Sequence, residues 1–342
     1  MVVLVTPNDP RVDVSIIIPT WNGLRYLDAC LTAVAAQRDV EAETILVDNA
    51  SSDGTVEHVL RSHPWVLVRA LDSNRGFAGG VNAGARDARG RFIVVLNNDT
   101  VPEPGWLRAL VDGVDERAGF TLTTSRVVYV HEPDVIDSAG DGMLRWGGAF
   151  KRHHGQPADS AAESAEVFGV CGAACLVSKA VFDELGGFDE DFFASHEDVD
   201  LSYRARLLGH RCRYVADAVV RHHGSATLGR QSAFSVAQGQ RNLEWVYLKN
   251  TPAPLLVRTL PGHVLYDAAA AIHFARLGLL LPFLRGKLAA LRGLPQLLRK
   301  RAAVQRTRRV GAGAIWPHLE RRWLATKRRE KRFDRSLARD HS

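Results

Sequence analysis

The chain has 342 residues, of which 46% are hydrophobic and 24% are charged, a composition that excludes an intrinsically disordered protein and allows one large domain or two modest ones. Its net charge of +6 hides an asymmetry, because residues 285–342 carry 18 Lys and Arg side chains against four acids, whereas residues 1–284 have a net charge of −8. An acidic body would repel a polyanion, so we expect no nucleic-acid partner despite the basic end of the chain.

The first hundred residues alternate between short apolar strands and amphipathic helices. Continuous apolar runs predict buried strands at residues 14–19, 44–48, 65–69 and 92–96. Apolar residues at helical spacing, and the turn residues around them, predict helices at 24–34, 55–61 and 77–89. This strict alternation indicates an α/β fold with a doubly wound, mostly parallel, Rossmann-like sheet.

The pattern is looser after residue 101. It predicts a helix at 106–114 and a strand at 121–130, and then a mobile loop region at 138–166, which is rich in Gly, Ala, Ser and His. Order returns with an apolar run at 167–177, and the remaining elements are predicted at 179–185 (helix), 199–208 (helix) and 219–220 (strand).

A third section begins near residue 240 and is helical and basic. Residues 255–284 are largely apolar, but charged residues, Pro261 and Pro282 interrupt them, so they do not supply the roughly 20 clean apolar residues that a spanning helix needs. We favour amphipathic helices that lie in the membrane interface, followed by a tail attracted to anionic lipid. The alternative is a solvated helical extension that packs on the rest of the chain.

Two further features of the sequence bear on the cellular compartment of the protein. Cys30, Cys171, Cys175 and Cys212 have no C-x-x-C spacing, so they predict neither a zinc site nor a disulfide framework and agree with a reducing cytosol. Residues 1–10 lack the basic and apolar regions of a secretory signal. We therefore expect a cytoplasmic protein.

Four polar clusters follow the predicted strands, at residues 19–23, 48–55, 74–82 and 97–99. One such cluster could be an ordinary Asx turn, but four at equivalent places predict a single crevice beyond the carboxyl ends of the strands, where open α/β sheets bind ligands. The loop with Gly76, Gly79 and Gly80 permits close approach to a ligand. It lacks the context of a Rossmann fingerprint, and no G-x-x-x-x-G-K-[ST] motif occurs, which argues against a dehydrogenase and a P-loop enzyme.

These motifs match a known family in order and spacing. Together with residues 186–190 (GGFDE) and 197–204 (EDVDLSYR), they make residues 14–225 resemble the family 2 glycosyltransferases, in particular the bacterial rhamnosyltransferase-like members that build cell-surface polysaccharide. The resemblance implies a GT-A fold, a nucleotide-sugar donor, a divalent cation (Mg²⁺ or Mn²⁺) and inversion at the anomeric carbon. It divides the chain into a catalytic domain at 1–240, with a nucleotide-binding half (about 12–100) and an acceptor half (about 101–240), and a membrane-associated C-terminal region at 241–342.

The resemblance also implies roles for individual donor-site residues. Asp48 would accept the imide N–H of uracil or thymine, unless it only closes an Asx turn. Asp99 would be the main anionic metal ligand and His222 a second one, although His223 is adjacent and a lone histidine is often only structural. Asn97 would reach the ribose or donor sugar. The other nucleotide-sugar contacts implied are Pro19, Thr20, Asn22, Asn74, Gly76, Gly79, Asn82 and Asn98.

The usual Asp-x-Asp motif of the family opens here with an amide, Asn97. Losing one carboxylate should weaken cation binding, because the number of charged ligands tunes affinity. Glu197 and Asp198 begin a predicted helix, where acids are favoured in any case. By resemblance, Asp198 is the general base that deprotonates the acceptor hydroxyl as it attacks opposite the leaving phosphate, and Glu197 binds the acceptor.

The sequence therefore predicts an inverting, metal-dependent glycosyltransferase. Our best assignment is transfer of L-rhamnose from dTDP-rhamnose to a lipid-linked or polysaccharide acceptor in cell-envelope glycan synthesis, at the inner face of the cytoplasmic membrane. Two alternatives stay open: the same fold with a UDP- or GDP-hexose donor, and a degenerate nucleotide-sugar-binding protein, which the substitution at Asn97 would suit.

Overall fold

The computed structural model describes residues 12–224 and 232–340. Some residues that the predictions used lie outside this range. They are residues 1–10, on which the expected cytoplasmic location rests, residue 225 at the end of the family resemblance, and the last two residues. The predicted boundary at residue 240, between the catalytic domain and the C-terminal region, falls inside a helix, α7 (Ala233–Asn250).

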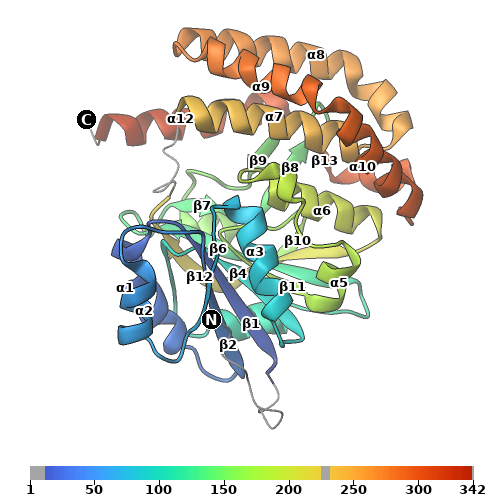
Figure 1. Cartoon of the computed structure of the whole chain (residues 1–342). Helices are drawn as coiled ribbons and strands as arrows, with labels where there is room; N and C mark the ends of the chain where they lie inside the picture. Colours follow the sequence, from blue (N-terminus) through green and yellow to red (C-terminus); the bar gives the residue numbers. More distant parts are fainter. Residues whose placement is uncertain (1–11, 225–231, 341–342) are drawn as a thin grey trace.

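The central sheet has a parallel half and a mixed half (Figure 1). The parallel half has the order β4–β1–β2–β3, with bounds β1 Val14–Thr20, β2 Ala42–Asp48, β3 Leu67–Ala70 and β4 Phe92–Leu96. The mixed half continues from β4 in the order β11–β6–β12–β10, with bounds β6 Phe120–Tyr129, β10 Ala165–Val167, β11 Ala174–Ser178 and β12 Arg211–His222. Two short strands complete it, β5 (Thr100–Pro102) on β12 and β7 (Ile136–Ser138) on β6.

Helices cover both faces of this sheet, which explains the continuous apolar runs of its strands. Successive side chains of a strand point to opposite faces, so Ile16 and Ile18 pack with Leu27 of α1, whereas Ile17 packs in the cluster that contains Val81 of α3. Within the described residues, the α-helices of this part are α1 Leu24–Ala35, α2 Thr55–Ser62, α3 Gly76–Asp87, α4 Trp106–Asp112, α5 Lys179–Glu184 and α6 Glu197–Leu207.

The prediction of a mobile loop at 138–166 is wrong. This segment holds β8 (Asp141–Leu144), β9 (Ala149–Lys151), a 3₁₀ helix (Ala158–Ala161) and the start of β10. β8 and β9 form a hairpin, and a strand from the far end of the chain, β13 (Leu319–Glu320), pairs in parallel with β8. The strands are too short for a clear periodicity, and a partner so distant in sequence leaves no local signal. Strand β12 is also longer than predicted.

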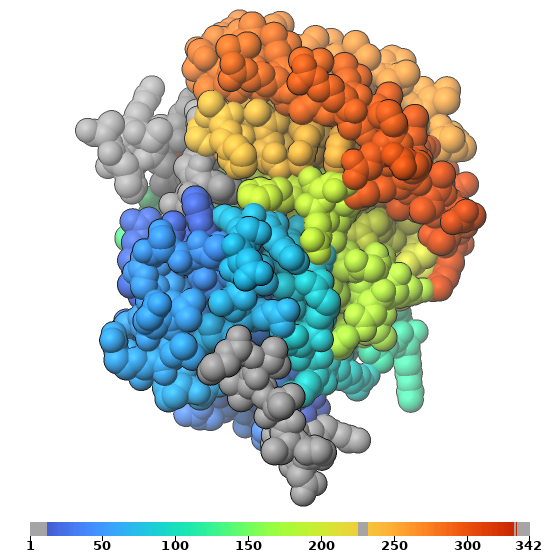
Figure 2. Space-filling view, in the orientation of Figure 1, coloured from blue at the N-terminus to red at the C-terminus, as the bar shows by residue number. Residues whose placement is uncertain are grey.

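The C-terminal helices form a layer on one end of the molecule, with α7 beneath α8 and α9 (Figures 1 and 2). A third hydrophobic cluster joins this layer to the part that contains the central sheet, and it includes Tyr203 of α6, Trp245 of α7 and Leu297 of α10. Among the residues that the structure describes, no helix has both the length and the apolar character needed to cross a membrane. The remaining bounds are α8 Ala253–Arg276, α9 Leu280–Arg292, α10 Leu294–Thr307, α11 Ala312–Ile315, a 3₁₀ turn Trp316–His318 and α12 Trp323–Asp340.

Candidate active site

The carboxyl ends of β1 and β2 present Thr20 and Asp48, both of which are buried. The Asp48 carboxylate accepts one hydrogen bond, from the Ser51 backbone N–H to Oδ2 at 3.0 Å. Its other oxygen, Oδ1, is buried and has no hydrogen-bond partner among the described residues. A buried acceptor without a donor is uncommon in native structures, so this atom suits a ligand N–H.

Asn22 joins the loops that follow β1 and β2. Its backbone N–H donates to Ser51 Oγ at 2.9 Å, and its Oδ1 accepts the Ser52 backbone N–H at 2.8 Å. Asp53 continues the connection by accepting the Leu24 backbone N–H at 3.1 Å. Asn22 therefore shapes the crevice edge, and its predicted contact with the donor stays a prediction.

The glycine-rich motif at the start of α3 packs against the loop before α6. Gly76 has a φ of +70°, and a Cβ there would lie 2.3 Å from the Phe193 carbonyl oxygen. Asn74 fixes the turn by accepting the Gly76 backbone N–H at 2.8 Å. A Cβ on Gly79 would meet the Arg75 side chain at 2.6 Å. At these two glycines, close packing within the protein already excludes a side chain.

Asn82 and Pro19 also have protein partners. The Asn82 amide donates to the Phe188 carbonyl oxygen at 2.8 Å, and its Oδ1 accepts the Phe188 N–H at 2.9 Å, so it holds the 186–190 motif on α3. Pro19 lies in β1, where its Cβ would be 3.3 Å from a Cβ on Gly80. The predicted donor contacts of Pro19, Asn74, Gly76, Gly79 and Asn82 stay predictions.

Asp99 and His222 are brought together by the pairing of β5 with β12, which places Thr100 opposite His222. The His222 Nε2 atom lies 3.3 Å from Asp99 Oδ1, and its Nδ1 lies 2.8 Å from Asp137 Oδ2. All three side chains are buried. Burial alone would lower the pKa of His222, but the hydrogen bonds to Asp137 and Asp99 outweigh it and raise the pKa to about 9.

His223 is arranged differently. Its ring packs against Tyr26 in a tilted arrangement, with the ring centroids 4.8 Å apart, and approaches His131 edge-on. Of the two adjacent histidines, His222 is therefore the one in contact with the Asp99 carboxylate.

The residues present fit a divalent cation. A carboxylate oxygen and an imidazole nitrogen lie together, and Asp137 binds the other nitrogen of His222, an arrangement that orients metal-ligating histidines. Asp137 is itself held by the Tyr129 hydroxyl at 3.0 Å and by Lys151 Nζ at 2.7 Å. Sequence reasoning missed Asp137, because it lies beside the segment interpreted as a loop and belongs to none of the motifs.

Asn97 and Asn98 directly precede Asp99 in the chain. The Asn98 amide donates to Thr20 Oγ1 at 2.8 Å and so connects the β4 and β1 ends, and a Cβ on Gly23 would collide with it. The Asn97 backbone N–H donates to the Ala173 carbonyl oxygen at 2.9 Å, and its side chain is half-buried.

Asp198 lies in the first turn of α6 and contacts Gly172, the neighbour of the Ala173 residue that Asn97 binds. Its Oδ2 accepts the Gly172 backbone N–H at 2.8 Å, and its Oδ1 accepts the Val199 N–H at 2.8 Å. Asp141 and Cys171 lie close by, with ligand atoms of the three side chains within 4.8 Å of one another. Burial raises the pKa of Asp198 above its ordinary value, because desolvation disfavours the charged carboxylate.

Glu197 is buried, and its Oε2 atom has no hydrogen-bond partner within the described part of the chain. Burial and then the Asp198 charge raise its pKa well above the ordinary value. The residues just before it, Phe193, Ser195 and His196, have φ values of 61°, 73° and 68°. Positive φ in three non-glycine residues is a strained arrangement that is typical of functional sites.

Helix α7 holds this strained loop in place. The fully buried Asn242 donates from Nδ2 to the carbonyl oxygens of Phe192, Ala194 and Ser195, at 2.9, 2.9 and 2.7 Å. Arg241 donates to the Asp191 carbonyl oxygen at 2.6 Å. Neither Arg241 nor Asn242 was among the predicted site residues, because nothing in the local sequence indicates partners 47–50 positions away.

Comparison with known proteins agrees with this geometry. The model of the family described as "Glycosyltransferase like family 2" matches residues 10–247. The chain is 27% identical over 249 residues to N-acetylglucosaminyl-diphospho-decaprenol L-rhamnosyltransferase of Mycobacterium tuberculosis, covering 65% of this chain and 80% of the relative. It is 28% identical over 228 residues to O-antigen biosynthesis protein RfbC of Myxococcus xanthus, covering 63% of this chain and 17% of that protein.

Solved structures with the same fold include three from different sources. GalNAc-T7 with UDP, GalNAc and Mn²⁺ has a TM-score of 0.55 at 17% identity, over 71% of this chain and 51% of that one. The mannosyltransferase PcManGT from Pyrobaculum calidifontis, with GDP-Man and Mn²⁺, has a TM-score of 0.51 at 19% identity, over 86% and 85%. S. aureus TarS 1–349 with UDP has a TM-score of 0.54 at 17% identity, over 86% and 88%.

The predicted fold class is thus confirmed, as a mostly parallel α/β sheet of the GT-A type with a helical C-terminal region. The family model covers more than half of the chain and ends inside α7. The chain therefore belongs to glycosyltransferase family 2 and is a nucleotide-sugar glycosyltransferase.

Proposed function

We propose that this enzyme is an inverting, metal-dependent glycosyltransferase that moves L-rhamnose from dTDP-rhamnose to a lipid-linked or polysaccharide acceptor in cell-envelope glycan synthesis. The observation that carries the proposal is that Asp198 and Asn97 bind consecutive residues, Gly172 and Ala173, so a base and the donor motif meet at one place. The M. tuberculosis relative, named as an L-rhamnosyltransferase of N-acetylglucosaminyl-diphospho-decaprenol, supports the sugar and the acceptor class.

Asp99 and His222 would hold Mg²⁺ or Mn²⁺, with Asp137 orienting the imidazole. When bound, such an ion supplies positive charge against the departing diphosphate. Because Asn97 replaces a carboxylate, Asp99 provides the only negative charge of its motif. Cation affinity in the absence of a nucleotide should accordingly be low.

Asp198 would take the proton of the acceptor hydroxyl. As the hydroxyl oxygen bonds to the anomeric carbon, the bond between that carbon and the donor phosphate oxygen breaks, which leaves an inverted glycoside and a nucleoside diphosphate. A carboxylate with a raised pKa is closer to the pH at which a general base is most effective. Glu197, whose buried Oε2 has no partner among the described residues, would bind a hydroxyl group of the acceptor.

Asp48 would select the base of the donor. Its unpartnered Oδ1 suits the imide N–H of thymine or uracil and not cytosine, which has no such proton. This contact does not distinguish dTDP from UDP, and guanine also carries a ring N–H. The choice among dTDP-, UDP- and GDP-sugars therefore has to be measured.

The C-terminal layer would place the enzyme on the inner face of the cytoplasmic membrane. Val257 and Val264 on α8 and Leu291 on α9 are 79%, 62% and 65% exposed. The first turn of α9 adds the exposed Leu281, and the exposed Arg276 and Arg285 lie on either side of it in the sequence. Apolar side chains next to cations are suited to the interface of an anionic bilayer.

The test is a panel of donors followed by a transfer assay. With Mn²⁺ present, dTDP-rhamnose should raise the melting temperature more than UDP-glucose, UDP-galactose or GDP-mannose does, because a ligand stabilises the state that binds it. Mass spectrometry should then detect rhamnose added to a polyprenyl-diphosphate-linked sugar. Stabilisation by a UDP- or GDP-sugar alone would reject the rhamnose assignment, and binding without transfer from any donor would favour a degenerate binding protein.

A further inference from the structure

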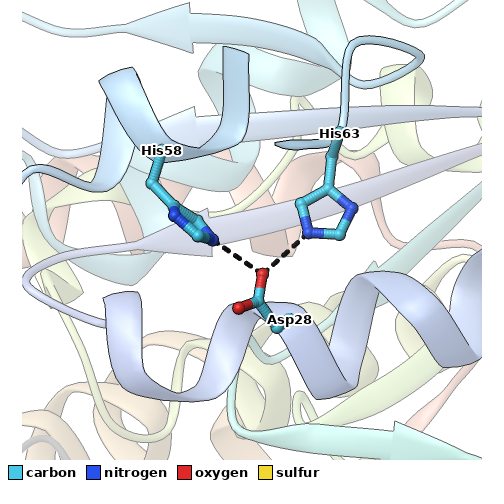
Figure 3. Close-up of side chains that lie close together, drawn as sticks. All are labelled: Asp28, His58 and His63. Atoms are coloured by element: carbon cyan, nitrogen blue, oxygen red, sulfur yellow. Dashed lines mark hydrogen bonds and ion pairs between the residues drawn. The ribbon is translucent and has the colours of Figure 1, made fainter. Parts of the chain in front are cut away.

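Asp28, His58 and His63 form a cluster on the surface of the nucleotide-binding half. Asp28 lies in the middle of α1, His58 lies in α2, and His63 directly follows α2. Figure 3 shows both imidazole rings approaching the carboxylate from the α2 side. The two Nε2 atoms lie 2.7 and 2.8 Å from the same oxygen, Asp28 Oδ1.

We propose that this cluster is a binding site for a divalent transition-metal ion, with Zn²⁺ as the best-suited ion. Two imidazoles and one carboxylate form a ligand set that Zn²⁺ prefers, whereas Mg²⁺ and Ca²⁺ prefer oxygen ligands alone. The ligand atoms lie within 4.8 Å of one another. The Asp28 side chain is 65% exposed, so water can complete the coordination.

The present distances are those of hydrogen bonds, and the change needed for coordination is small. Tetrahedral Zn²⁺ with bonds of about 2.0–2.2 Å holds neighbouring ligand atoms roughly 3.3 Å apart. The ligand atoms would have to separate by about half an ångström. The exposed Asp28 can make this movement, while His63 is mostly buried and packs edge-on against Trp65.

A second cluster illustrates why this one is the better candidate. Glu244, His263 and Asp267 also lie close together, but Lys287 Nζ already bonds to both carboxylates there. The structure gives Asp28 no Lys or Arg partner among the residues that it describes. The negative charge of Asp28 is therefore available to a cation.

An ion at this cluster would join α1 to α2. These helices begin at the loops that shape the donor edge, where Leu24 bonds to Asp53 and Asn22 bonds to Ser52. Binding should therefore stabilise the nucleotide-binding half without contact with the reacting atoms. The site shares no residue with the Asp99–His222 pair, so the two metal sites can be separated by mutation.

The test uses Zn²⁺ titrations of the full chain, followed by calorimetry and by thermal melting. The wild-type protein and the Asp99→Asn variant should both bind Zn²⁺ at the cluster, and Zn²⁺ should raise both melting temperatures. The His58→Gln/His63→Gln variant should bind one equivalent fewer and lose that gain. His318→Gln, an exposed histidine outside both sites, is the matched control and should behave as the wild type does.

If the double variant does not fold, Asp28→Asn replaces it, because this residue is exposed and an amide oxygen can still accept one histidine N–H. We expect Zn²⁺ to bind this variant at least about tenfold more weakly, since even an outer-shell partner of a metal ligand contributes about 10–100-fold. Equal Zn²⁺ stoichiometry and affinity in the wild type and the cluster variants would overturn the proposal. The cluster would then be only a hydrogen-bonded bridge between two helices.

Discussion

Gly172 donates its backbone N–H to the Asp198 carboxylate over 2.8 Å. The next residue, Ala173, accepts the backbone N–H of Asn97, and β11 then pairs antiparallel with β4, with Ala174 opposite Leu96. Main-chain hydrogen bonds along neighbouring strands thus set the position of the proposed base relative to the donor motif. A site built on strands in this way is held more rigidly than one on free loops.

Gly172→Ala should displace the carboxylate of Asp198. A Cβ at this position would lie 3.1 Å from Asp198 Oδ2, so the carboxylate has to shift. We expect kcat to fall about 10–100-fold, because small displacements of a reacting group are costly, while donor affinity stays unchanged. Gly313→Ala is the control, since no atom of the described residues lies within 4 Å of a Cβ there. An unchanged kcat would show that the Gly172–Asp198 contact does not position the base.

Asp198→Asn should separate catalysis from binding. We expect nearly normal donor binding and a decrease in kcat of about 10²–10⁴-fold, the usual effect of losing a general base. In the wild type, activity should fall as the pH drops through the raised pKa of Asp198, above the ordinary range of an aspartate, because only the deprotonated carboxylate can accept the proton. The exposed Asp183→Asn should leave the rate unchanged. A variant with wild-type kcat would leave Asp198 as an ordinary helix-start acid.

Asp99→Ala should abolish the part of donor binding that depends on Mn²⁺, because it removes the only carboxylate of the Asn97–Asn98–Asp99 motif. Calorimetry with the donor, with and without Mn²⁺, measures this difference. The exposed Asp72→Ala is expected to retain it. Undiminished Mn²⁺-dependent binding in Asp99→Ala would reject the metal role.

Lys249→Met tests the buried ion pairs that connect α7 to α6. Lys249 Nζ lies 2.7 Å from both Asp189 and Asp200, and its side chain is only 2% exposed. Removing it takes one cation away from each of two buried carboxylates, while Asp200 keeps Arg204 and Asp189 keeps Lys300. The free energy of unfolding should therefore fall by about 3 kcal/mol, the lower end of the effect of breaking a buried ion pair. Denaturant titration measures the change. The exposed pair Lys179–Asp183 provides the control, because Lys179→Met should change stability by less than about 1 kcal/mol.

This stabilisation should depend on pH in a defined direction. Burial would raise the pKa of Asp200, but Lys249 and Arg204 outweigh it and hold the folded-state pKa below the ordinary value. The contribution is therefore complete above the unfolded-state pKa, near 4, and is lost as the pH falls toward the folded-state value. The stability difference between wild type and Lys249→Met should shrink in that window. A difference that grows on acidification would contradict this account.

Membrane association can be tested by substitution. A chain shortened before α8 would expose Trp245 and the surrounding cluster, so point changes are the sharper test. We expect the wild type to sediment with anionic liposomes at moderate salt. The double variant Val264→Glu/Leu281→Glu should bind at least about tenfold more weakly, because each aliphatic side chain buried in the membrane contributes about 1.5–3 kcal/mol. Leu60→Glu, an equally exposed leucine on α2, should bind normally. Equal sedimentation of all three proteins would reject the membrane role of α8 and α9.

Local patterns were sufficient to predict the first half of the fold. The run that contains Ile16 and Ile17 is apolar because both faces of its strand are covered, and this property is visible in the sequence itself. The polar residues after such strands must gather at one edge of a parallel sheet. For this reason Thr20, Asp48 and Asn98 could be placed near one another before the structure was known.

Long-range contacts could not be predicted in the same way. Asp137 binds His222 from 85 positions away, and Asn242 binds Ser195 from 47 positions away. Neither leaves a periodic signal, because each is a single polar residue whose partner lies on another element. The choice between the two alternatives for the C-terminal helices stays open, since one side of this layer packs on the rest of the chain and the other exposes apolar residues.

The pairing of β13 with β8 has a consequence for the synthesis of the enzyme. Leu319 and Glu320 leave the ribosome long after Met143 and Leu144, the residues with which they pair, yet they complete the small sheet that contains Asp141, a neighbour of the proposed base. Domains generally fold as they emerge, starting from the N-terminus. Here the parallel half of the main sheet can form early, but the small sheet beside the proposed base has to wait until β13 has been synthesised, so a chain that stops before β13 would contain the first sheet without the second in its complete form.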